Sequence, residues 1–104
     1  MIAKLIRVHV KPGRLSQYLA AQAIWNRETS KAPGYAGHFC GRDANDSNLI
    51  QLIFFWRSRA DLDRWMADHH DRIESLARAD EHFERHEVGI FEEVLPPPTE
   101  KVSG

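Results

Sequence analysis

The segment LIQLIFFWR, residues 49–57, constrains the fold of this chain more than any other. Its residues favour a β-strand, and apart from Gln51 and Arg57 neither face of that strand is polar. A strand that is apolar on both faces belongs where both are covered, in the middle of a sheet or in an interface. We therefore expect the rest of the chain to build layers around it.

Three further segments favour strands. Residues 2–10 mix Leu, Ile and Val with charged residues, and residues 35–43 contain glycines that permit a bulge or a close backbone approach. The polar residues 45–48 join the second strand to residues 49–57 as a hairpin. Residues 87–95 alternate as a last strand, which ends where three consecutive prolines begin.

Two segments favour helices. The first runs from about residue 14 to about residue 30, between the turns Pro12-Gly13 and Pro33-Gly34. The second starts near Arg59, because Ser58 and Asp61 match a capping box. Its inward stripe recurs at three and four residues: Leu62, Trp65, Met66, His69 and Ile73. The spacing extends as far as Ala79, with the His69-His70-Asp71 step as a place where the helix can kink.

The expected order is strand, helix, strand, strand, helix, strand, which is typical of the ferredoxin-like βαββαβ fold of the α+β class. Both helices then cover one face of a four-stranded antiparallel sheet. The other face would expose Ile, Val and Phe side chains, at a cost of about 25 cal/mol per Å². We therefore expect a second copy to cover it, giving a homodimer that is a dimeric α+β barrel.

Size, charge and cysteine content exclude several classes of function. The 104 residues make one domain, and a net charge of −1 with interspersed signs offers no patch to nucleic acid or to a membrane surface. The longest apolar run is far shorter than the about 20 residues of a membrane span. Cys40 is the one cysteine, and no signal-peptide pattern precedes the first strand. We expect a cytoplasmic protein.

Motifs at three separated places carry a family resemblance. Lys11-Pro12-Gly13 follows the first expected strand, Pro33-Gly34-Tyr35-Ala36-Gly37 opens the second, and Phe55-Trp56-Arg57-Ser58 closes the third. These residues resemble the antibiotic-biosynthesis-monooxygenase (ABM) superfamily of dimeric α+β barrels. The resemblance implies one ABM-like ferredoxin-fold domain over residues 1–95, followed by a proline-started flexible tail over residues 96–104.

Within that superfamily, Trp25, the glycine-bearing second strand and His70-Asp71-Arg72-Ile73 resemble the YdbC-like family, which has no assigned activity. Other members are cofactor-free oxygenases of aromatic compounds or haem-degrading enzymes. The resemblance implies a ligand site between the sheet and its own helices.

Haem-degrading relatives use an asparagine on the first strand, a tryptophan on the third and a histidine late in the second helical region. Trp56 matches the tryptophan, but the other two positions fall on Ile6 and near Ser75. We therefore expect no haem site of that kind, no cofactor and no metal, although His69 or His70 could reach a metal from a different turn.

His69-His70-Asp71 is the first candidate for proton chemistry, because histidine titrates near neutral pH and a carboxylate can fix its tautomer. Adjacent helical residues point about 100° apart, so one of the two histidines can face the sheet. His69 fits the apolar stripe, whereas the family resemblance falls on His70-Asp71. The structural alternative is a helix exit, where a histidine favours the negative end of the helix dipole.

Trp56, Trp65 and Trp25 are the expected aromatic wall of a ligand pocket, although a core alone would also use such rings. His9 and His38 join this pocket if their strand faces turn to the same cleft. The lone cysteine is expected as a buried structural thiol.

His82 and His86 have the i, i+4 spacing that can chelate a metal on a helix, but the glutamate of a zinc-protease motif is missing. Solvated charges leading into the last strand are the interpretation we favour.

Three functions are compatible with these residues. The first is a homodimer that binds a small apolar or aromatic molecule and acts as a cofactor-independent monooxygenase, with His70 or His69 as the base and Asp71 orienting it. The second is a dimer of the same fold that binds a ligand without turnover. The third is a structural dimer with a filled core.

Overall fold

The computed structural model describes residues 1–98 and confirms the ferredoxin-like βαββαβ order. The elements are β1 (Ile2–Val10), α1 (Leu15–Thr29), β2 (Tyr35–Arg42), β3 (Leu49–Trp56), α2 (Arg59–Ala77), a short 3₁₀ helix η1 (Ala79–His82) and β4 (Phe83–Glu92). Residues 99–104 of the expected tail lie outside the described residues. Within residues 1–98, no helix is long and apolar enough to cross a bilayer.

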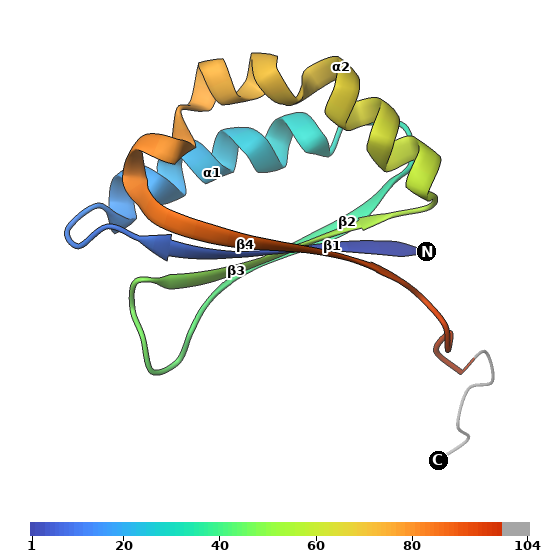
Figure 1. Cartoon of the computed structure of the whole chain (residues 1–104), viewed down its shortest axis with the longest axis horizontal. Coiled ribbons are helices and arrows are strands. Elements are labelled where there is room, and N and C mark those ends of the chain that lie inside the picture. The colour runs from blue at the N-terminus through green and yellow to red at the C-terminus, as the bar shows by residue number, and fades with distance from the viewer. Residues whose placement is uncertain (99–104) are drawn as a thin grey trace.

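The four strands form one antiparallel sheet in the order β2-β3-β1-β4. β3 lies between two neighbours, which agrees with the apolar character of both its faces. Both helices cover the same face of the sheet, and the opposite face is left open in the single chain (Figure 1). The predicted arrangement of helices on one face is therefore confirmed.

The register of the two central strands sorts their side chains between the two faces. Even-numbered residues of β1 pair with even-numbered residues of β3 and turn toward the helices, while odd-numbered ones turn to the open face. The buried members of the helix-facing set are Ile2, Val8, Val10, Ile50, Leu52, Phe54 and Trp56. Together with the helical residues Tyr18, Ala21, Leu62, Trp65, Ile73, Ala77 and Ala79 they make the core.

Ser58 caps the start of α2 as expected, and this cap explains one glycine. Ser58 Oγ accepts a hydrogen bond from the Asp61 amide at 3.1 Å and donates one to Asp61 Oδ2 at 2.9 Å. Gly34 lies against this cap with φ of 87°, and a Cβ there would come within 2.4 Å of the Asp61 side chain. Only glycine fits this approach. The expected bulge in β2 occurs between Tyr35 and Gly37.

The last strand differs from the prediction. β4 begins at Phe83 rather than at residue 87, because its pairing with β1 extends back to Val10. It ends at Glu92 rather than at residue 95, because β1 has no residue left to pair. The last backbone bond joins the Glu93 amide to the Met1 carbonyl. The residues near the start of β4 are charged, so the sequence pattern did not indicate a strand there. An edge strand tolerates such charges on its faces.

The alternative interpretation of His69-His70-Asp71 as a helix exit is wrong. α2 continues through this step to Ala77. The chain then turns at Arg78, whose φ of 54° and ψ of 40° are left-handed, so Ala79 belongs to η1 and not to α2. A helix that ends on a left-handed residue usually has glycine there.

Arg78→Gly should raise the free energy of unfolding by about 0.5 to 1 kcal/mol, because glycine adopts the left-handed conformation without a Cβ clash. Losing the exposed Arg78–Glu81 ion pair offsets little of the gain. Urea denaturation measures the difference. The matched control, Ala67→Gly in the exposed middle of α2, should lower stability by about 1 kcal/mol. A destabilised Arg78→Gly protein would contradict the assignment of strain to this residue.

Candidate functional site

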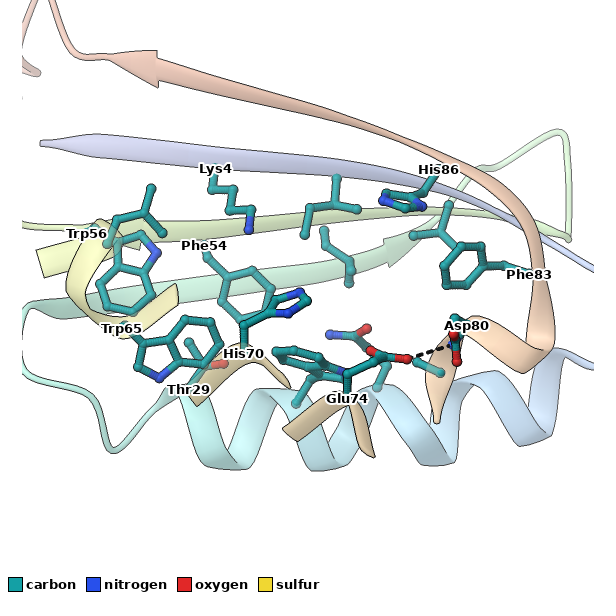
Figure 2. Close-up of a pocket in the computed structure, with 17 residues that line it drawn as sticks. Lys4, Thr29, Phe54, Trp56, Trp65, His70, Glu74, Asp80, Phe83 and His86 are labelled. Atoms are coloured by element: carbon teal, nitrogen blue, oxygen red, sulfur yellow. Dashed lines mark hydrogen bonds between the residues drawn. The ribbon is translucent and has the colours of Figure 1, made fainter. Parts of the chain in front are cut away.

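A cavity of about 310 Å³ lies between the helix-covered face of the sheet and the two helices (Figure 2). This volume is near the lower end of the range, about 300–1,000 Å³, that small-molecule sites occupy. Residues from every helix and from three strands line it: Lys4, Ile6, Val8, Gln22, Trp25, Thr29, Leu52, Phe54, Trp56, Leu62, Trp65, His70, Glu74, Ala79, Asp80, Phe83 and His86. The core is therefore not filled at this point.

The three tryptophans form one aromatic wall. The Trp65 ring lies 5.8 Å from that of Trp25 and 5.6 Å from that of Trp56, in tilted contacts that aromatic rings prefer over a flat sandwich. Trp56 is 1% exposed and Trp65 is 7% exposed. These rings fit both the pocket-wall and the core interpretation, because each packs in the core and also borders the cavity.

His70 is the histidine of α2 that reaches the cavity. Its ring lies 5.2 Å from that of Trp25, and its Nδ1 lies 3.2 Å from Oδ1 of the exposed Asp71. His69 does not line the cavity, and its Nδ1 lies 3.5 Å from the Arg72 guanidinium. Asp71 thus contacts His70 from the solvent side, outside the cavity.

The apolar stripe pointed to His69 because helical spacing permits two continuations from Met66. A step of three residues selects His69 and a step of four selects His70, and both fit 3.6 residues per turn. In the structure the second half of α2 turns His70, Ile73 and Ala77 inward. The family resemblance had selected His70.

Glu74 is a cavity residue that the sequence reasoning missed. It lies one helical turn after His70, and its Oε1 accepts a hydrogen bond from the Asp80 amide at 3.1 Å (Figure 2). Burial raises the pKa of Glu74; the Asp80 amide opposes this shift, the Asp80 carboxylate adds to it, and His70 opposes it. The i, i+4 spacing of a histidine and a glutamate was the available signal.

Lys4 is a second residue that was missed, because on the sequence it reads as an ordinary polar residue of a strand. Its ammonium lies 3.2 Å from Met66 Sδ, a weak hydrogen-bond acceptor. Burial lowers the pKa of Lys4 below that of a lysine in water. Lys4 occupies an even position of β1 and pairs with Phe54, so its side chain lies on the helix-covered face of the sheet.

Two side chains of the cavity wall carry polar atoms that lack a protein partner. Within residues 1–98, Thr29 Oγ1 and Trp56 Nε1 are the buried side-chain atoms without a hydrogen bond. Thr29 is 2% exposed, at the end of α1. Buried polar groups without a partner are rare in native proteins.

The other candidates lie elsewhere. His9 is on the open face, where its Nε2 lies 3.0 Å from Glu87 Oε1. His38 is on the helix side but at the edge strand, bonded to the Tyr35 hydroxyl and exposed. The two strand faces therefore do not turn to one cleft, because odd and even positions alternate across the sheet.

Cys40 is exposed, so its expected burial is wrong, because β2 is an edge strand that the helices cover incompletely. Partial burial still raises the pKa of its thiol, which disfavours the thiolate.

The metal-binding spacing of His82 and His86 is not realised in the structure. His82 ends η1 and His86 lies on β4, so the helical spacing argument does not apply to them. Within residues 1–98, no three His, Cys, Asp or Glu side chains gather as metal ligands. Of the two positions that depart from the haem-degrading pattern, Ile6 lines the cavity and Ser75 is exposed.

Glu74→Gln should stabilise the protein at neutral pH. Because the folded state raises the pKa of Glu74, it resists ionisation, and stability falls as pH rises past the pKa of an unfolded glutamate. Glutamine keeps an oxygen for the Asp80 amide without the charge. The gain should vanish below a pH of about 4, where the carboxyl is protonated in both states. Thermal unfolding across this pH range measures it, with the exposed Glu84→Gln as control; an equal gain at both ends would contradict the interpretation.

The solved structures that resemble the chain include a cofactor-independent oxygenase and antibiotic biosynthesis monooxygenases. SnoaB, a cofactor-independent oxygenase from Streptomyces nogalater, has a TM-score of 0.78 and 20% identity over 93% of this chain and 96% of that one. A candidate antibiotic biosynthesis monooxygenase from Nitrosomonas europaea has a TM-score of 0.77 and 17% identity over 91% and 100%. A conserved protein from Methanosarcina mazei has a TM-score of 0.78 and 19% identity over 88% and 91%. At these identities the likeness establishes the fold.

No curated protein matches the sequence. One family model does, over residues 2–91, and this range spans all the helices and nearly all of the sheet. The chain therefore belongs to the family described as a domain of unknown function, DUF4937.

Proposed function

We propose that the protein binds a small aromatic molecule in the cavity between its sheet and its helices and oxygenates it without a cofactor. The observation that carries this proposal is the position of His70, beside Trp25 and one turn from Glu74, on a cavity whose wall is mostly aromatic and apolar. The fold that it shares with SnoaB supports the same reaction type. The closer resemblance to the YdbC-like family, and a cytoplasmic location, stay predictions.

In this reaction His70 acts as the general base. Contact with Asp71 holds Nδ1 and leaves Nε2 to take a proton from an activated CH₂ group or a phenol of the substrate. The electron-rich carbanion then reacts with dioxygen. An activated CH₂ and O₂ give C=O and water, so the substrate carbon supplies all four electrons that reduce O₂ and both hydrogens of the water. No external reductant is needed.

Asp71 contacts His70 from outside the cavity, whereas Glu74 is the carboxyl one turn from His70 that lines the cavity. Its fixed Oε1 leaves the other oxygen for a proton, and burial keeps that proton on the carboxyl to higher pH. A group of this kind can return a proton to the peroxide intermediate after oxygen has added.

A binding protein without turnover is the second candidate. The side chain of His70 is 41% exposed, whereas a carbanion that meets oxygen requires a dry site. This observation favours a ligand-binding module unless the ligand itself excludes water.

His70→Ala should lower oxygen consumption with a phenol or hydroquinone substrate by about 100-fold or more, because the general base is lost. An oxygen electrode and a panel of such compounds provide the measurement. His69→Ala, on the same helix but outside the cavity, is the matched control and should retain activity. Binding of panel compounds without oxygen uptake by the unmodified protein would select the binding module instead.

We further propose that the protein is a homodimer held by its open sheet faces. The apolar side chains on this face are Ala3, Leu5, Phe39, Leu49, Ile53, Phe55 and Phe91. Phe39 is 55% exposed and Phe91 is 57% exposed, one on each edge strand. The Phe39 ring lies over Gly41 and the Phe91 ring over Gly89, so close that a Cβ on either glycine would clash. An exposed apolar face of this kind is suited to packing on a second sheet.

Phe39→Glu and Phe91→Glu should each shift the protein from dimer to monomer, because a charge in the middle of an apolar interface is desolvated. Sedimentation equilibrium at micromolar concentration measures this. Leu76→Glu is the control, since Leu76 is 57% exposed on α2, on the other side of the sheet. An unmodified protein that sediments as a single chain would contradict the dimer.

A further inference from the structure

One end of the cavity carries hydrogen-bond donors that have no acceptor. Thr29 Oγ1 and Trp56 Nε1 are the buried side-chain polar atoms of residues 1–98 without a protein partner, and both residues line the cavity. Indole N–H groups can only donate, and a threonine hydroxyl can donate. Both residues are at least 98% buried, so neither atom has bulk water as its hydrogen-bond partner.

Lys4 adds a cation to the same end. Its neighbours across the strands are Phe54 and Ile90, and those on its own strand are Ile2 and Ile6, all apolar. Within residues 1–98 it belongs to no ion pair, and its one hydrogen-bonding contact is the Met66 sulfur. A partly buried ammonium without a counter-ion is unfavourable, so this position favours an anion.

The carboxylates of the cavity lie at its other end. Figure 2 shows Lys4, Trp56 and Thr29 toward one end and Glu74 with Asp80 toward the other, with Phe54 and His70 between them. Trp56 is a diagonal neighbour of Lys4 on the same sheet face, because Lys4 pairs with Phe54 and Trp56 with Ile2. The cavity is therefore polarised along its length, and a bound molecule has one preferred direction.

We propose that the ligand is a planar aromatic carboxylate, which places its anionic group against Lys4. Trp56 and Thr29 donate hydrogen bonds to its oxygens, and its ring lies against the tryptophan wall. Charge-assisted hydrogen bonds of this kind are stronger than neutral ones. The inference rests on the proposed function and deepens it, since it names the ligand class and directs the far end of the ring toward His70 and Glu74.

Three naphthalene probes that carry an anionic, a neutral or a cationic substituent at the same ring position test this proposal: 2-naphthoate, 2-naphthamide and 2-naphthylmethylammonium. Isothermal titration calorimetry with the full chain measures their affinities. We expect naphthoate to bind at least about tenfold more tightly than the amide, and the ammonium to bind most weakly. Equal binding of all three would agree with the proposed aromatic site but contradict the proposal that the ligand is a carboxylate. Binding of none of them would overturn the proposed function and the inference together.

Lys4→Met should remove the preference for naphthoate over the amide, because it keeps the aliphatic stem and deletes the charge. Lys11→Met, which removes the same charge from an exposed position, should keep the preference. A preference that survives in Lys4→Met would overturn the role of Lys4.

Thr29→Val separates binding from stability. Because the hydroxyl has no protein acceptor, its loss should leave the melting temperature unchanged or higher, while the affinity for naphthoate falls several-fold. A destabilised variant with unchanged affinity would show that the hydroxyl serves the fold and not the ligand.

Discussion

The pairing of β1 with both β3 and β4 decides which side chains the cavity receives. Two hydrogen-bonded ladders hold this strand, and its even positions turn toward the helices. A shift of one residue would move Lys4 and Ile6 to the open face and bring Arg7 and His9 under the helices. The ammonium that faces the cavity, and the separation of His9 from the site, both follow from this register.

Core and cavity share the same walls. Trp56, Leu62 and Trp65 bury almost all of their surface and also line the empty space, so the fold is stabilised by the residues that would contact a ligand. The opposite end depends on a strained turn. Arg78 takes a left-handed conformation, η1 follows, and the Asp80 amide comes back to Glu74. Strain that positions a polar group of a cavity is a recurrent feature of functional sites.

The two ends of the cavity have different chemistry. One end has two donors without acceptors and a cation without a counter-ion, the other has two carboxyls, and a half-exposed histidine lies between them. This separation gives a bound molecule a direction, with one end held and the other presented to proton-transfer groups. A filled structural core would need none of these polar groups, which is why binding is favoured over a purely structural role.

Local patterns in the sequence were sufficient for the elements. Alternation, helical spacing, the Ser58 cap and the Pro33-Gly34 turn each depend on residues close together along the chain, and the element order then leaves few topologies. The same local signals failed where the sequence pattern fits two different local structures equally well. Met66 can be followed inward by His69 or by His70, and the charged start of β4 could belong to a helix end or to an edge strand.

The sequence by itself determined the fold class, the helix-free apolar face and the three tryptophans as wall or core. Only the tertiary structure decided that His70 and not His69 reaches the cavity, that Cys40 is exposed, and that Lys4 and Glu74 belong to the site. The physical reason is that each of these facts concerns the distance between residues far apart in the chain. Register and helix packing set such distances, and no periodicity within one segment contains them.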